Sequence, residues 1–237
     1  MIKRVIHTAI TLAVLLVSCR QDDLLDSMPT AHEGYVALRF SADIPAMQEV
    51  VTRSVDPDGG GVQDMTLFCF DSYGLFTTTV EAKVTPTGNG AGLTGNFEAE
   101  VPENTRTVHF LANQNMSEFK EDKFRNKSEA EVMALLEGSS GRMIYWARFT
   151  CDPDNDSKID AQMADKGNTI KMIRNHAQVS IDNPINGWIE VTGFVAYNTN
   201  AFGTVAPYHP EKGFDFEWPG EDDPFVTLPQ NDARMSD

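Results

Sequence analysis

The chain has 237 residues, and 35 acidic against 19 basic side chains give it a formal net charge of −16. A length near 240 allows one large all-β domain or two small ones, and a composition of 41% hydrophobic and 23% charged residues is globular. The acidity argues against nucleic-acid binding, which needs a basic face, and against electrostatic attachment to an anionic membrane.

The N-terminus has the pattern of a secretory signal followed by a lipidation site. Lys3 and Arg4 precede an apolar run over 5–17, which is shorter than the roughly 20 residues of a membrane-spanning helix. The run ends in LVSC at 16–19, which resembles a bacterial lipobox. We therefore expect a lipoprotein signal peptide over 1–18 and acyl chains such as palmitate on Cys19. The alternative is an ordinary signal peptide cut elsewhere, with Cys19 incidental.

The next segment is polar and acidic, with little periodicity. It predicts a flexible leash over 19–34, after the lipidated Cys19, and a folded domain over 35–237. Two or more acyl chains give stable anchoring, so the leash would tether a surface-exposed lipoprotein to the outer membrane without spanning it. Such an acidic start is similar to the segments that follow the lipid cysteine in surface lipoproteins of Bacteroidetes.

From residue 35 onward the dominant pattern is a period of two, which is typical of strands. The predicted strands are Tyr35–Ala42, Met65–Phe70, Leu75–Val84, Phe97–Val101, Thr107–Asn113, Arg142–Phe149, Asn168–Ile181, Trp188–Tyr197 and Phe225–Leu228. One helix is predicted after Ser128, because Ser128 and Glu131 have capping-box spacing and an apolar stripe follows before Gly138. These elements predict an all-β fold, a β-sandwich with one short helix inserted.

Few residues point to catalysis. His109 and His176 lie in predicted strands, and neither belongs to a metal-spaced or nucleophile motif, so a partnered histidine on a strand face is the favoured interpretation. No phosphate-binding or hydrolase motif occurs. We therefore expect no enzyme, no catalytic residue and no cofactor.

One acidic loop is a weak calcium candidate, through Asp152, Asp154, Asp156 and Asp160. Carboxylates at alternate positions resemble the front half of a calcium loop, but Ser157 stands where glycine is needed and Met163 where a bidentate glutamate is needed. A solvated acidic turn is the favoured alternative.

Without Cys19, the remaining cysteines are Cys69 and Cys151. An oxidising compartment would permit a bridge between them, although the apolar run around Cys69 favours a buried free thiol.

Several segments between about residues 62 and 210 together resemble the fimbrillin family, the Bacteroidetes surface lipoproteins that form type V pili. The segments are MTLFCFD at 65–71 with Gly74 and Phe76, Val101-Pro102 through VHFLAN at 108–113, IKMIRNHAQV at 170–179, and FVAYN at 194–198 with GTVAP at 203–207. The third is the most specific, being similar to the family's Leu-x-Arg-x-x-Ala-x-Val strand.

The resemblance implies a transthyretin-like sandwich that polymerises by donor-strand exchange with other fimbrial subunits. In that family an arginine-specific protease removes the N-terminal strand, and a partner's strand refills the groove. Here Arg53-Ser54 follows the first predicted strand, so this bond is the expected processing site, the alternative being an ordinary exposed arginine. Cleavage would release the subunit from its lipid, moving it from the outer membrane to the fimbrium.

The C-terminal part departs from the family, whose members usually carry a second sandwich domain with the donor strand. The last residues, 231–237, are polar and not strand-like, so we expect either a one-domain member or a truncated one. A stalk, tip, anchor or adhesin role, the last with a host or bacterial surface ligand, stays open. The alternative function is a surface glycan- or peptide-binding lipoprotein that never polymerises, and a third is a secreted hydrolase.

Overall fold

The computed structural model describes residues 31–43, 62–86, 95–114, 116–138, 143–175, 193, 203–208 and 211–215. The chain divides into two compact units, Met1–Ala31 and His32–Asp237, and every helix and strand described here belongs to the second. The domain boundaries expected after residues 18 and 34 stay predictions.

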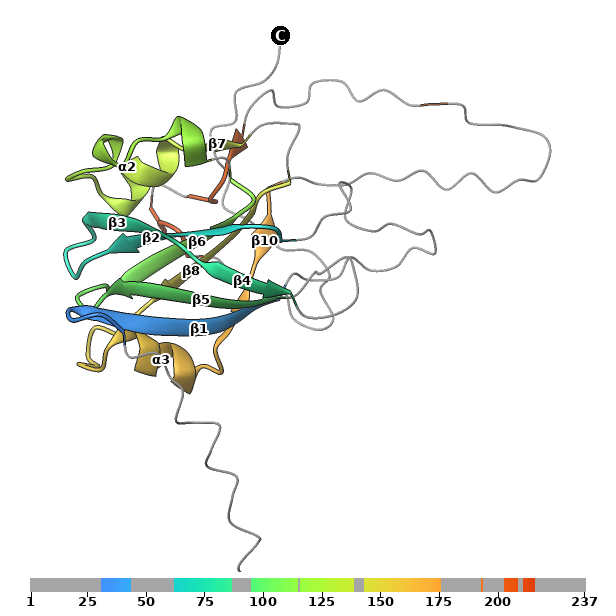
Figure 1. Cartoon of the computed structure of the whole chain (residues 1–237). Coiled ribbons are helices and arrows are strands. Elements are labelled where there is room, and N and C mark those ends of the chain that lie inside the picture. Colours follow the sequence, from blue (N-terminus) through green and yellow to red (C-terminus); the bar gives the residue numbers. More distant parts are fainter. Residues whose placement is uncertain are drawn as a thin grey trace, which may run out of the picture. The chain divides into compact units, whose positions relative to one another are not determined.

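Most of the regular secondary structure in the described chain consists of short strands (Figure 1). They are β1 (Tyr35–Asp43), β2 (Met65–Phe70), β3 (Phe76–Glu81), β4 (Lys83–Pro86), β5 (Gly95–Pro102), β6 (Thr107–Ala112), β7 (Glu137–Gly138), β8 (Tyr145–Thr150), β9 (Thr169–Lys171), β10 (Ile173–Arg174) and β11 (Gly203–Thr204). A four-stranded sheet has the order β4-β5-β1-β9, and a five-stranded sheet has the order β10-β8-β6-β2-β3, while β7 pairs with β11. This arrangement confirms the all-β sandwich.

The five-stranded sheet is covered on both faces, which explains why β2 and β6 are buried at every position. Leu67 and Cys69 belong to the core between the two sheets, whereas Phe68 and Phe70 belong to a second core on the other face. That second face is covered by the segment 116–138 and by residues 205–208 and Phe214. Continuous apolar runs such as 65–70 follow from burial on both faces.

Two strands change sheet part-way along their length. β3 pairs with β2 in the five-stranded sheet, and after Ala82 the chain continues as β4, which pairs with β5 in the other sheet. In the same way β9 pairs with β1, and after the fully buried Met172 the chain continues as β10 beside β8. The predicted strand over 75–84, and the start of the one over 168–181, are therefore each divided between both sheets.

The predicted helix is present as α2 (Glu129–Ala134), and its capping box is confirmed. The Ser128 Oγ accepts from the Glu131 amide, while the Glu131 carboxylate accepts from the Ser128 amide at 2.8 Å. The structure adds a second short helix, α3 (Ile159–Asp165), and two 3-10 turns, η1 (Met116–Glu118) and η2 (Glu121–Lys123). The sequence did not indicate α3 because its N-cap, Lys158, makes no side-chain capping bond.

Cys69 and Cys151 are both free thiols buried in the core between the sheets, so the free-thiol interpretation is confirmed. Burial raises the pKa of Cys69 to about 12, which keeps it protonated and unreactive.

The strands predicted at 188–197 and 225–228, and the part of the 168–181 strand beyond Asn175, lie outside the described residues.

Candidate functional site

The first described strand, β1, has β5 on one side in the four-stranded sheet and, at its last three residues, β9 on the other. It runs antiparallel to β5, from Tyr35 opposite Pro102 to Ser41 opposite Asn96. On its other side the end of β1 runs parallel to β9, with Ser41 opposite Thr169. β1 is thus inserted between strands that come from two distant parts of the chain.

Backbone hydrogen bonds hold β1 on both sides. The Ser41 amide donates to the Asn168 carbonyl at 2.8 Å, and the Met172 amide donates to the Asp43 carbonyl at 2.8 Å. Near the start of β1, the Glu103 amide donates to the Gly34 carbonyl at 3.0 Å. If β1 left the sheet, these groups of its neighbours would lose their partners, which is costly unless water or another strand replaces them.

One face of β1 is apolar and buried, since Val36, Leu38, Phe40 and Ala42 alternate with more exposed residues. Phe40 stacks on Phe97 with ring centres 5.3 Å apart and meets Phe110 edge-on at 4.9 Å. Burying a Leu or Phe side chain stabilises by about 1.5–3 kcal/mol each. The site that β1 occupies is therefore an apolar groove, with backbone groups of β5 along one side and those of β9 at one end of the other side.

The link from β1 to the rest of the sandwich runs through residues 44–61, between Asp43 and Val62. A cut in this link would leave β1 held in the sheet by non-covalent contacts. The predicted processing bond, Arg53-Ser54, belongs to this link and lies outside the described residues, as does the predicted lipidation site Cys19.

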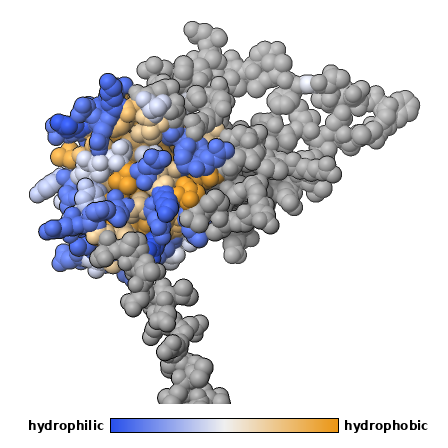
Figure 2. Space-filling view, in the orientation of Figure 1, coloured by the Kyte–Doolittle hydropathy of each residue, from blue (hydrophilic) through white to orange (hydrophobic). Residues whose placement is uncertain are grey.

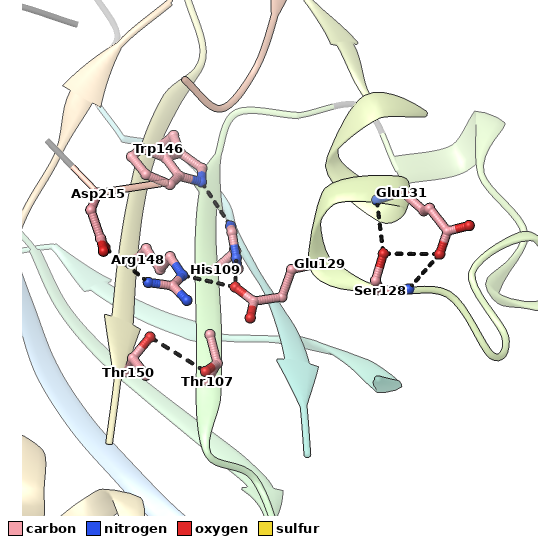
Figure 3. A network of polar contacts seen from close by, with 9 residues as sticks. All are labelled: Thr107, His109, Ser128, Glu129, Glu131, Trp146, Arg148, Thr150 and Asp215. Carbon is pink, nitrogen blue, oxygen red and sulfur yellow. Dashed lines mark hydrogen bonds and ion pairs between the residues drawn. The ribbon is translucent and has the colours of Figure 1, made fainter. Parts of the chain in front are cut away.

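A second group of polar residues lies on the far side of the five-stranded sheet (Figure 3). His109, on β6, is fully buried, and its Nδ1 accepts from the Trp146 indole N–H at 3.0 Å. Because the indole can only donate, the proton of His109 is on Nε2, which donates to Glu129 Oε2 at 2.9 Å. Arg148 Nε donates to the same oxygen at 2.8 Å, and its Nη1 lies 3.5 Å from Asp215.

Burial lowers the pKa of His109 although Glu129 acts to raise it, so the ring is neutral at neutral pH. For Glu129, burial acts to raise the pKa, but hydrogen bonds from His109 and Arg148 outweigh it and hold the pKa at about 2. Both ring nitrogens are occupied and the ring is not exposed, so the prediction of a partnered face histidine is confirmed for His109, while His176 lies outside the described residues. The group ties α2 to β6 and β8, and it offers no base to a substrate.

This group predicts a loss of stability in acid. Both pKa values are lower in the folded than in the unfolded chain, so the unfolded chain binds the protons more tightly. The free energy of unfolding should decrease once the pH falls below 6.5, the ordinary pKa of histidine. It should decrease further once the pH falls below 4.5, the ordinary pKa of glutamate. Urea unfolding between pH 8 and pH 3 measures this. A midpoint that is constant from pH 7 to pH 5 would contradict the contribution of His109.

The acidic loop before α3 is held by its own hydrogen bonds. The Gln162 Nε2 donates to the carbonyls of Asn155 at 3.0 Å and of Ser157 at 2.9 Å, so an amide N–H group faces these oxygens. No three His, Cys, Asp or Glu side chains in the described part are arranged to hold a metal ion. Calcium binding at Asp152, Asp154, Asp156 and Asp160 stays a prediction.

No family model matches the chain, and no curated protein does so significantly. Among solved structures, the chain is similar to a fimbrial assembly protein from Parabacteroides distasonis, with 14% identity and a TM-score of 0.39. The match covers 85% of this chain and 80% of the other. A likeness this distant supports no functional argument.

None of the described helices is long and apolar enough to cross a lipid bilayer.

Sequence patterns did not reveal two features of these sites. The contact of Ser41 with Thr169 joins residues 128 positions apart, and that of His109 with Glu129 joins a strand to a helix. The period-two pattern gave the face of each side chain but carries no information on which strand lies next to which.

Proposed function

We propose that this chain is a fimbrial subunit, or a pilus-associated adhesin, made as an outer-membrane surface lipoprotein with acyl chains on Cys19. Cleavage at Arg53-Ser54 separates β1 from the rest of the sandwich, and an extended strand of another subunit then takes its place. The proposal assigns no reaction to the chain. Its basis is the resemblance of the sequence segments at 65–71, 101–113, 170–179 and 194–207, together with the position of β1.

The position of β1 is the observation that carries the proposal. An edge strand could leave with little loss, but β1 pairs with β5 along most of its length and with β9 through residues 41–43, so its departure opens a slot beside β5 that β9 borders at one end. The slot would expose Phe97 and Phe110 together with unpaired backbone groups. An extended strand with alternating apolar residues can supply both the hydrogen bonds and the side chains, which is β-augmentation.

Arg53→Ala tests the proposal in cells that make and display the protein. We expect the variant to stay lipidated at Cys19 and to be absent from high-molecular-weight fibres, whereas unaltered protein is recovered in fibres with Ser54 at its N-terminus. N-terminal sequencing and gel electrophoresis of surface material measure both. Arg125→Ala is the matched control, because Arg125 is an exposed arginine in a turn outside the proposed processing bond, and it should process and assemble normally.

Two results would contradict the proposal. One is mature unaltered protein that keeps an acylated Cys19 and is found only as monomers, which is the behaviour of a non-polymerising binding lipoprotein. The other is an Arg53→Ala variant that enters fibres as efficiently as the unaltered chain.

A further inference from the structure

Side chains of opposite charge lie beside the two edges of the five-stranded sheet. At the β8 edge a hollow of about 320 Å³ is lined by Arg148, Lys166 and Lys171, together with Phe149, Phe214 and Asp215. We call it the basic notch. At the β3 edge a hollow of about 490 Å³ is lined by Asp64, Glu81 and Glu121, together with Gln114, Met116 and Phe119. We call it the acidic hollow.

The basic notch arises where the chain changes sheet between β9 and β10. β10 pairs with Tyr145 and Trp146 alone, so β8 from Ala147 onward has β6 on one side and no described strand on the other. Arg148 is engaged by Glu129 and Asp215. Neither Lys166, which lies over the Phe149 ring at 5.1 Å, nor Lys171 forms an ion pair with a described residue. The notch therefore presents two ammonium groups beside an open strand edge.

The acidic hollow contains a buried acceptor without a donor. Gln114 is only 7% exposed, and its Oε1 has no hydrogen-bond partner within the described structure. A buried carbonyl oxygen without a donor is costly, and an incoming ammonium group would satisfy it. Glu81 forms no ion pair with a described residue, while Glu121 is held in place by Thr78 and Thr79. Met116 and Phe119 offer an apolar wall to a lysine stem.

The two hollows lie at the same height along the strands. In the register of the sheet, Arg148 is opposite His109, His109 opposite Phe68, and Phe68 opposite Thr79 of β3. The neighbouring row joins Trp146, through Leu111 and Thr66, to Glu81. The basic notch and the acidic hollow are thus at opposite ends of the same rows of the sheet.

We propose that copies of this chain associate head to tail, with the basic notch of one copy against the acidic hollow of the next. Lys166 and Lys171 of one copy face Glu81, Glu121 and the Gln114 oxygen of its neighbour. A second copy is the partner because each copy carries both complementary surfaces. Molecules with a net charge of −16 repel each other unless the contact joins opposite charges.

The described surface in Figure 2 is mostly hydrophilic, with smaller hydrophobic patches, which suits association through charge. A contact between two different surfaces on opposite edges leaves one of each surface free on every pair, so further copies add to build a row or a closed ring. This head-to-tail association needs no removal of β1 and is independent of the proposed strand exchange.

The test uses the chain without residues 1–18, carrying Cys19→Ala and Arg53→Ala, so that neither lipid nor cleavage contributes. Copies with ¹⁴N and ¹⁵N are mixed and treated with a carbodiimide, which joins amines to carboxylates in contact. Mass spectrometry should find cross-links from Lys166 or Lys171 of one copy to Glu81 or Glu121 of another. Sedimentation should show assembly that increases with concentration.

Charge reversal then separates the two surfaces. Lys166→Glu with Lys171→Glu should weaken self-association about tenfold or more, and so should Glu81→Lys with Glu121→Lys. Glu81→Lys is also tested alone, because Glu121 belongs to η2 and its substitution can disturb that turn. The single variant should weaken self-association as well. A one-to-one mixture of the two double variants should associate again. The reversed notch, now acidic, can contact the reversed hollow of the other variant, now basic, and the two unaltered surfaces remain complementary. Lys127→Glu with Lys158→Glu changes the net charge by the same amount as the lysine reversal, but away from both hollows, and this variant should associate like the parent.

The proposal is overturned if the parent chain stays monomeric without these cross-links, or if reversal leaves self-association unchanged. It is also overturned if the mixture of variants does not recover. Since the chain is neither cut nor lipidated in this test, such a failure leaves the strand-exchange proposal unaffected.

Discussion

Phe40→Ala is expected to lower the free energy of unfolding by about 3–5 kcal/mol, the usual cost of removing a buried phenylalanine. Phe40 is 3% exposed and contacts Phe97 and Phe110 with its ring. The neighbours belong to β5 and β6 in different sheets, so they cannot close together to fill the cavity without moving a strand. Urea unfolding of the uncut chain measures the loss.

The matched control is Arg39→Ala, one residue away on the opposite face of β1. Arg39 forms an ion pair with Glu98 at 3.2 Å, and both side chains are well exposed, so the change should cost no more than about 1 kcal/mol. Equal losses for the two variants would contradict the assignment of Phe40 to the core.

The same substitution bears on assembly. In protein cut at Arg53, β1 would stay in place only through its non-covalent contacts, so Phe40→Ala should also speed its release or its replacement by a synthetic strand peptide. Retention of the cut fragment on gel filtration reports this step.

Glu129→Gln is expected to lower the free energy of unfolding by about 2–4 kcal/mol at pH 7. The carboxylate oxygen of Glu129 accepts from both His109 and Arg148. A neutral amide accepts more weakly, and it leaves the partly buried Arg148 charge with Asp215, at 3.5 Å, as its described counter-ion. Thermal or urea unfolding measures the loss.

Glu131→Gln is the control, since Glu131 lies on the same helix but is exposed and serves the capping box. It should cause a smaller loss. The pH profile gives a second readout, because Glu129→Gln should abolish the loss of stability between pH 4.5 and pH 2 that the lowered pKa of Glu129 produces. If the variant still loses stability between pH 4.5 and pH 2 as the unaltered chain does, another carboxylate causes that loss.

Local patterns in the sequence were enough to predict the longer described strands and α2, although not α3. The alternation of β1 placed Val36, Leu38 and Phe40 on one face, and the Ser128–Glu131 spacing predicted the start of α2. These features depend on residues a few positions apart, for which periodicity and capping are direct physical signals. The all-β class followed from the number of such strands.

The tertiary structure decided which elements meet. It placed β1 between β5 and β9, moved the chain from one sheet to the other at Ala82 and Met172, and joined His109 to Glu129 and Arg148. These outcomes depend on contacts between distant segments, where the gain from packing and pairing outweighs local preference. A strand that alternates is equally suited to an edge or to the middle of a sheet. The sequence thus predicted a strand over residues 35–42, and only the fold placed the end of that strand between β5 and β9.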